Sequence, residues 1–191
     1  IEGGEIRLDD ELLGEIRGDV QRVARGDING DGVEEALIAA GAGRTDREAP
    51  AQIYAVHADG AELLWERAGE RAQVTDLRVV DGRIFLATFL DDRLVQGGWL
   101  NEGVFEPVSE ARLGLAQLPM PDDSIVIGRI YGEETRSDGD LRRHRGESSA
   151  LLPSMRGVKA LTLSDLDNNG VPELLVSDGW HYQYGHSATA R

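Results

Sequence analysis

Two stretches of the sequence repeat one spacing of acids and glycine: GDINGDGVEEALIAAG, residues 26–41, and SDLDNNGVPELLVSDG, residues 164–179, which lie 138 positions apart. In each, an acid or amide occupies every second position, a glycine follows the third of them, and a glutamate precedes a short apolar run. Glycine at this point permits the positive φ that folds a loop back on itself. The spacing predicts a loop that directs oxygen atoms toward one point and then enters a β-strand.

Between these stretches the chain reads as short strands joined by turns. Alternating apolar and polar residues surround Asp59-Gly60, Asp81-Gly82 and Asn101-Glu102-Gly103, which are typical hairpin turns. Helical periodicity is nearly absent: residues 7–18 are the one stretch that fits a short amphipathic helix, and Gly14 weakens it. The sequence therefore predicts an all-β protein.

The apolar strands recur at a nearly constant interval. Each follows an acid or amide, at Asp31, Asp81, Asp123 and Asn169, and the intervals are 50, 42 and 46 residues. A period of about 40–50 residues with four short strands is typical of a β-propeller blade. We expect four-stranded antiparallel blades over the following ranges: residues 20–70, 71–110 and 111–156, with the end of a preceding blade at 1–19 and an incomplete blade at 157–191.

The expected strands fall into groups of two, four, four, four and three, which do not close a four-bladed ring neatly. Both ends of the chain look cut, because it starts at Ile1 without methionine and ends on a β-compatible segment. We therefore expect a partial propeller that further blades or another chain complete.

Composition excludes several functional classes. A chain of 191 residues with 24 glycines has room for a core and many turns. A net charge of −15 argues against a nucleic-acid partner. The absence of cysteine excludes disulfides and thiolate chemistry. No apolar run approaches the roughly 18 residues of a membrane helix, so we expect no membrane insertion.

The two repeated loops carry the ligand types that calcium prefers. Ca²⁺ binds six to eight oxygen atoms, and side chains at loop positions 1, 3 and 5, a carbonyl at 7 and a carboxylate at 9 supply them. The candidate ligands are Asp27, Asn29, Asp31, the Val33 carbonyl and Glu35 in the first loop, and Asp165, Asp167, Asn169, the Val171 carbonyl and Glu173 in the second. Similar sequences also occur as ordinary turns, but two in identical register favour two calcium sites.

An EF-hand would require a glutamate at loop position 12, where this chain has Ile38 and Val176. A loop that closes at position 9 and leads into a strand instead resembles the FG-GAP or VCBS repeat of integrin-α-type β-propellers. The pattern Asp-x-(Asp/Asn)-x-(Asp/Asn)-Gly-x-x-(Asp/Glu), followed by an apolar strand, is matched in both loops. The resemblance covers about 16 residues at each loop.

This resemblance implies structural calcium in a propeller. Extracellular calcium modules bind in the range of about 10⁻⁴–10⁻³ M, which is useful only outside the cytosol. We therefore expect an extracellular, cell-surface or periplasmic module that binds a protein or glycan. Two alternatives stay open: a calcium-dependent polysaccharide-lyase-like enzyme, and a structural subunit whose blade edges pair with another chain. We nominate no catalytic residue, because no nucleophile, metalloprotease or phosphate-loop motif is present.

Two further segments stand out in a chain with only 5% aromatic residues. Residues 178–186 concentrate rings that are a possible ligand-binding platform or, alternatively, strand residues that pack against a neighbouring blade. These rings are Trp180, His181, Tyr182, Tyr184 and His186. Residues 136–149 are rich in arginine and are expected to form a solvated loop.

Overall fold

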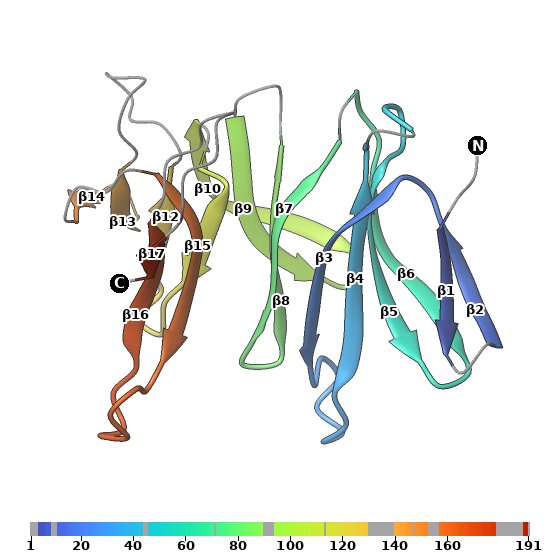
Figure 1. Ribbon diagram of the computed structural model, residues 1–191, viewed down its shortest axis with the longest axis horizontal. Coiled ribbons are helices and arrows are strands. Elements are labelled where there is room, and N and C mark those ends of the chain that lie inside the picture. The colour runs from blue at the N-terminus through green and yellow to red at the C-terminus, as the bar shows by residue number, and fades with distance from the viewer. Residues whose placement is uncertain are drawn as a thin grey trace. The chain divides into compact units, whose positions relative to one another are not determined.

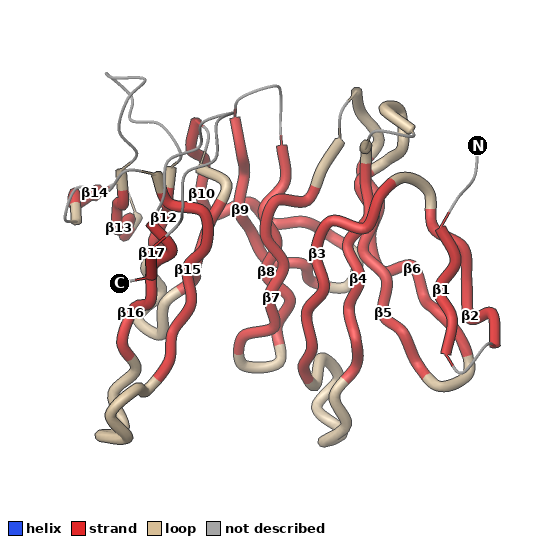
Figure 2. The backbone as a smooth tube through the Cα atoms, viewed as in Figure 1, coloured by secondary structure: helices blue, strands red, loops and turns tan. Residues whose placement is uncertain are grey.

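The computed structural model describes residues 4–8, 11–43, 46–70, 72–89, 94–112, 114–129, 140–146, 148–152, 157–178 and 189–190. Every regular element in these ranges is a β-strand (Figures 1 and 2). Among the described residues, no helix has the length and apolar character needed to cross a membrane. The all-β prediction is therefore confirmed, and the described part of residues 7–18 contributes to strands rather than to a helix.

Seventeen strands in the described residues form five antiparallel sheets, and the strands of each follow one another along the chain. Their bounds are β1 (Gly4–Leu8) and β2 (Glu11–Ile16); β3 (Asp19–Gly26), β4 (Glu35–Gly41), β5 (Ala51–His57) and β6 (Gly60–Arg67); β7 (Val74–Val80), β8 (Arg83–Phe89), β9 (Leu94–Asn101) and β10 (Val104–Arg112); β11 (Ala116–Pro119), β12 (Ile125–Gly128), β13 (Leu141–Arg145) and β14 (Ser148–Leu151); and β15 (Val158–Ser164), β16 (Glu173–Asp178) and β17 (Thr189–Ala190).

The sheets contain two, four, four, four and three strands, the grouping that the sequence predicts. The chain also divides into two compact units, Ile1–Val108 and Ser109–Arg191. What the strands establish is an all-β protein of antiparallel sheets.

Two hairpin turns lie where the sequence predicts them. Asp81 and Gly82 have φ of 49° and 72°, and Glu102 and Gly103 have φ of 48° and 79°. Positive φ at both central residues is characteristic of a type I′ turn, whose twist matches that of the flanking strands.

The third predicted turn, Asp59-Gly60, is wrong by one residue. His57 pairs with Gly60, which belongs to β6, so the turn residues are Ala58 and Asp59. Glycine at this point extends the ladder of strand pairs and does not form the turn itself.

The core of the first unit lies between its two four-stranded sheets. It contains Leu37 and Ile53 from β3–β6 together with Leu77, Ile84 and Leu86 from β7–β10. Gly26 makes this packing possible, because a Cβ built there would lie 2.6 Å from the Cβ of Val79. The close approach of β3 to β7 therefore requires glycine at the end of β3.

Polar side chains also join these two sheets. The backbone N–H of Val74 donates to the Gln21 side-chain oxygen at 2.6 Å, and the Gln21 amide donates to the carbonyl of Ala42 at 3.1 Å. The N–H of Ala42 in turn donates to the carbonyl of Ala72 at 2.7 Å. Gln21 thus connects β3 to the start of β7.

The hairpin β1–β2 covers the opposite face of the sheet β3–β6. Ile6 and Ile16 form a small cluster with Ala40 and Tyr54. β2 lies against β6, the last strand of that sheet. The hairpin therefore covers the later strands of the sheet and leaves the face of β3 exposed, with Val20 at 54% and Val23 at 66% exposure.

The second unit has its own apolar cluster, which joins β11 and β12 to β15 and β16. Leu118 and Val126 pack there with Leu161 and Val176.

The arginine-rich segment of this unit differs from the sequence prediction. Within the described part of residues 136–149, Leu141–Arg145 form strand β13 and not a solvated loop. Arg143 donates to the Asp122 carboxylate and to the Ser124 hydroxyl, both at 2.8 Å. These polar partners allow a charged segment to occupy a strand.

Candidate metal centre

The first acidic loop joins β3 to β4 and projects beyond the sheet (Figure 1). Gly30 and Gly32, at loop positions 4 and 6, have φ of 77° and 85°. A Cβ at either position would meet nothing within 4 Å, so backbone conformation rather than crowding requires glycine. The two left-handed residues turn the chain back toward its starting point.

The Asp27 carboxylate organises the backbone of this loop. It accepts hydrogen bonds from the N–H of Gly30 at 2.6 Å and from the N–H of Gly32 at 2.9 Å. At the far side, the Glu35 carboxylate accepts the N–H of Ile28 at 3.1 Å. The residues at positions 1 and 9 therefore close the loop from both ends.

The second loop, between β15 and β16, repeats this arrangement. Asn168 and Gly170, at positions 4 and 6, have φ of 57° and 84°. Asp165 accepts the N–H of Gly170 at 2.8 Å, and Glu173 accepts the N–H of Leu166 at 2.8 Å. The repeated sequence pattern thus corresponds to repeated hydrogen bonds and repeated backbone conformation.

Positions 5 and 7 also match between the loops. The N–H of Val33 donates to Asp31 at 2.7 Å, and the N–H of Val171 donates to Asn169 at 2.8 Å. Both valine side chains are 63% exposed, so their burial does not explain their position. Each valine contacts the loop through its backbone N–H and not through its side chain. This is expected of a position that would offer its carbonyl oxygen to a cation.

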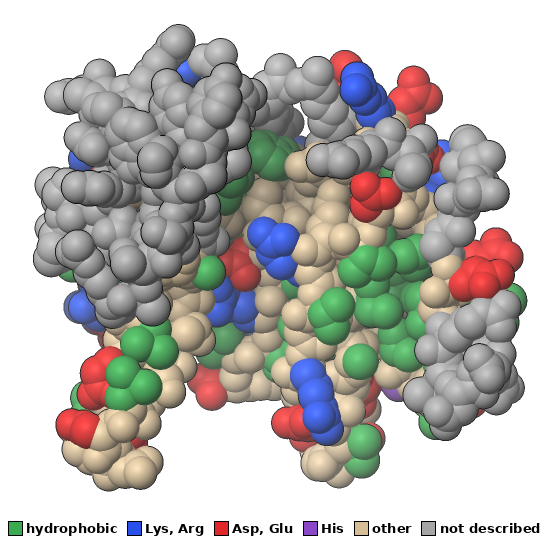
Figure 3. Space-filling model, viewed as in Figure 1, with side chains coloured by type: hydrophobic (Ala, Val, Ile, Leu, Met, Phe, Trp, Pro, Cys, Tyr) green, Lys and Arg blue, Asp and Glu red, His purple; other side chains and the backbone are tan. Residues whose placement is uncertain are grey.

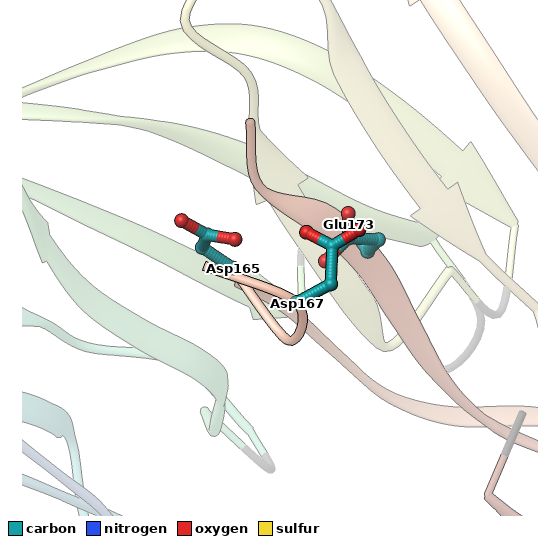
Figure 4. Close-up of side chains that lie close together, drawn as sticks. All are labelled: Asp165, Asp167 and Glu173. Atoms are coloured by element: carbon teal, nitrogen blue, oxygen red, sulfur yellow. The ribbon is translucent and has the colours of Figure 1, made fainter. Parts of the chain in front are cut away.

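In the second loop, three carboxylates converge. One oxygen each of Asp165, Asp167 and Glu173 lies within 4.8 Å of the others (Figure 4). Oxygens on opposite sides of one Ca²⁺ ion are about 4.6–5.2 Å apart, because each lies 2.3–2.6 Å from the ion. The donor set and its spacing therefore fit a hard divalent cation.

The first loop has the same donor types but a different internal contact. The Asn29 amide nitrogen donates to Asp31 at 3.1 Å and to Glu35 at 3.0 Å. This amide group lies between two carboxylates and offsets their repulsion. In the second loop the amide is at position 5, where Asn169 donates to Asp167 at 2.9 Å. Exchange of the acid and the amide between positions 3 and 5 therefore distinguishes the two loops.

Hydrogen bonds keep the first loop's leading acid ionised. The pKa of Asp27 is lowered from its ordinary value, chiefly by the backbone N–H of Gly32 and with burial acting in the opposite direction. A carboxylate that stays charged is the form that binds a cation. Figure 3 shows acidic side chains on both projecting loops.

The surroundings of the two loops differ. Ile28, at position 2 of the first loop, packs against the core between the two sheets of its unit. The turn at Gly82 also lies against this loop, since a Cβ there would come 3.4 Å from the carbonyl oxygen of Asp27. Leu166 is the equivalent residue of the second loop and is 63% exposed. The first loop is therefore part of a sheet-to-sheet contact.

Position 4 is the feature that sequence reasoning missed. Gly30 and Asn168 both adopt positive φ, although only the glycines at position 6 were expected to do so. The available signal was composition, since glycine and asparagine are the residue types that tolerate this conformation best. The aromatic candidates Trp180, His181, Tyr182, Tyr184 and His186 lie outside the described residues.

Comparisons with known proteins add little to this geometry. No protein-family model and no curated protein matches the chain. Among solved structures, the chain is similar to one described as the "Crystal structure of the computationally designed Ika4 protein", with a TM-score of 0.48, 15% sequence identity and 91% of each chain covered. A likeness of this degree carries no argument about fold or function.

Proposed function

We propose that this chain is part of a calcium-stabilised β-propeller that acts outside the cytosol as a binding module for a protein or glycan. The observation that carries the proposal is the repeated loop. Two segments in different sheets share the hydrogen bonds of the backbone N–H groups at loop positions 2, 6 and 7, their positive φ angles and their place between the first and second strands. Consecutive four-stranded antiparallel sheets are the arrangement that propeller blades use.

Calcium would have a structural role in this proposal. The first ion would be held by Asp27, Asn29, Asp31, the Val33 carbonyl and Glu35, and the second by Asp165, Asp167, Asn169, the Val171 carbonyl and Glu173. Bound Ca²⁺ would neutralise the clustered carboxylates and tie the first strand of a sheet to the second. Because the loops project from the sheets, stable loops would also hold a fixed surface for a ligand.

The location follows from the expected affinity. The loop ligands come from two short segments that join neighbouring strands, so we expect the weak binding of extracellular calcium modules, at about 10⁻⁴–10⁻³ M. Such sites fill outside the cytosol, where calcium is abundant. The proposed location is therefore extracellular, at the cell surface or periplasmic.

Calcium binding tests this proposal directly. Isothermal titration with Ca²⁺ should detect two sites, and millimolar Ca²⁺ should raise the melting temperature above that in EDTA. Asp27→Ala and Asp165→Ala should each remove one site and part of this increase. Asp59→Ala, in an exposed turn outside both loops, is the matched control and should leave both sites intact.

Absence of binding heat and of any calcium-dependent change in melting would overturn the proposal. The two loops would then be turns stabilised by their own hydrogen bonds, and the argument for a location outside the cytosol would be lost.

A further inference from the structure

Two asparagines of the acidic loops are each followed by glycine. They are Asn29, before Gly30, and Asn169, before Gly170. An Asn-Gly pair can deamidate without an enzyme, because the backbone nitrogen of the glycine attacks the side-chain carbonyl carbon of the asparagine. Glycine has no side chain to obstruct this approach. Both pairs are exposed, so water reaches the reacting groups.

The second loop keeps the reacting groups of its pair together. The N–H of Gly170 donates to the Asp165 carboxylate at 2.8 Å, which polarises the nitrogen that would attack. The N–H of Val171 donates to the side-chain oxygen of Asn169 at 2.8 Å. Such a donor stabilises the negative charge that develops on a carbonyl oxygen during attack. The folded loop therefore restrains both reaction partners and activates each of them.

The first loop has the same two hydrogen bonds and one further restraint. The N–H of Gly30 donates to Asp27 at 2.6 Å, and the N–H of Asp31 donates to the side-chain oxygen of Asn29 at 2.9 Å. The Asn29 amide nitrogen also donates to Glu35 at 3.0 Å. Glu35 is the first residue of β4 and is buried, so this bond ties the amide to the sheet.

The amide of Asn169 has its contact inside the loop itself. Its nitrogen donates to Asp167 at 2.9 Å, and Asp167 is an exposed loop residue. The loop as a whole is also less anchored, because Leu166 is 63% exposed whereas its equivalent Ile28 packs against the core of the first unit. Asn169 can therefore rotate toward the glycine nitrogen at a lower cost than Asn29.

We propose that Asn169 is a site of spontaneous deamidation, and that the contact with Glu35 protects Asn29 from the same reaction. In this reaction a bond forms between the Gly170 nitrogen and Cγ of Asn169, and the bond between Cγ and Nδ2 breaks. The proton that the Gly170 nitrogen loses passes through water to Nδ2, which leaves as ammonia. Water then opens the cyclic imide at either carbonyl and yields aspartate or isoaspartate at position 169.

Each product changes the second loop in a different way. Aspartate adds a carboxylate at loop position 5, where the first loop already has Asp31. Isoaspartate adds a carbon atom to the main chain before Gly170 and shortens the side chain, which displaces the oxygen that accepts the Val171 N–H. This inference goes beyond the proposed function, since it assigns a covalent modification and does not require calcium.

Peptide mapping of the full chain tests the proposal. The chain is kept at neutral pH in EDTA, sampled over time, digested with trypsin and sequenced by mass spectrometry. The mass increase from replacement of NH₂ by OH should appear at Asn169 about tenfold faster than at Asn29, the rate equivalent of one hydrogen bond to a charged group. Equal rates, or an earlier change at Asn29, would overturn the proposal.

Two controls separate structure from local sequence. Asn168 is exposed in the same loop but precedes Asn169 and not glycine, so it should change more slowly than Asn169; a faster change there would overturn the assignment. In urea the loop hydrogen bonds are lost, and the rates at Asn29 and Asn169 should become similar. A tenfold difference that persists in urea would show that structure does not set the preference.

Substitution of Glu35 tests the protecting contact. Glu35→Gln keeps the size of the side chain and removes the carboxylate that the Asn29 amide contacts, so the rate at Asn29 should rise toward that at Asn169. Glu34→Gln is the matched control, because Glu34 is exposed and pairs with Arg25 at 2.7 Å. An unchanged rate at Asn29 in Glu35→Gln, or an equal rise in both variants, would overturn the proposal.

Calcium separates this inference from the proposed function. Under the proposed function Ca²⁺ would take the side-chain oxygen of Asn169 as a ligand and restrain it, so deamidation there should be slower in Ca²⁺ than in EDTA. Faster change at Asn169 than at Asn29 in EDTA, with no effect of Ca²⁺, would support the modification site and count against calcium at the second loop. Calcium-dependent melting without deamidation at Asn169 would have the opposite meaning.

Discussion

Substitution of the glycine at loop position 6 by alanine tests whether both loops adopt positive φ there. Gly32 and Gly170 have φ of 85° and 84°, and a Cβ at either position would meet nothing within 4 Å. The cost of Gly32→Ala or Gly170→Ala is therefore conformational, at about 1–2 kcal/mol for a residue with Cβ in the left-handed region. Steric contacts add nothing to it.

For a chain of this length, about 1 kcal/mol lowers the melting temperature by about 2–4 °C. Each variant should therefore melt about 2–8 °C lower in EDTA, as measured by circular dichroism. Because the ion-free folded loop already has this strain, a calcium-bound loop with the same φ should bind Ca²⁺ with unchanged affinity.

Gly60→Ala is the control. Gly60 lies in β6 without positive φ, and a Cβ there would be 3.9 Å from the nearest atom, the carbonyl oxygen of Leu13. We expect its melting temperature to stay unchanged or to rise slightly. If Gly32→Ala and Gly170→Ala have the same melting temperature as Gly60→Ala, the positive φ angles are wrong and the two loops are not closed by them.

Three further predictions concern the first loop, the acid sensitivity and the core. Asn29→Asp should lower the melting temperature in EDTA and tighten Ca²⁺ binding at the first loop. The reason is that it replaces an amide that bridges Asp31 and Glu35 with a further carboxylate. Weaker Ca²⁺ binding in calorimetry would contradict this prediction. The pKa of Asp122 is held below its ordinary value of 3.8, first by the Ser124 hydroxyl and then by Arg143. Its charged form therefore stabilises the fold above pH 3.8, and this contribution to the free energy of unfolding is lost as the pH falls below that value. In urea titrations at a series of pH values, Asp122→Asn should lose less stability on acidification than the unsubstituted chain. An unchanged dependence of stability on pH would contradict the ion pair between Asp122 and Arg143. Phe85→Ala should cost about 3–5 kcal/mol, because Phe85 is fully buried with an edge contact to Trp99, whereas Val104→Ala at an exposed site should stay within about 0.5 kcal/mol.

Local chemistry made much of this architecture predictable. Turn residues with positive φ, such as Asp81-Gly82, have few conformational alternatives, and period-2 patterns specify which side chains share one face of a strand. The acidic loops were predictable for the same reason, because their hydrogen bonds join residues within nine positions of one another. The hairpin at Ala58-Asp59 was misplaced because its strand pairing extends one residue further than composition indicates.

Arginine content led to the wrong prediction for Leu141–Arg145. The partner that permits this strand is Asp122, 21 residues before Arg143, and no local pattern links the two. Nor did the sequence indicate that the Asn29 amide would bridge two carboxylates, since that contact depends on side-chain rotation within the folded loop.

The sequence alone determined the strand grouping, the two type I′ turns and the register of the two acidic loops, because each depends on residues close together along the chain. Only the tertiary structure decided which equivalent residues are buried. Val23 and Leu161 occupy the same place in their strands, yet one is 66% exposed and the other 2%. Burial depends on the neighbouring sheet, and the sequence of a strand does not specify which sheet packs against it.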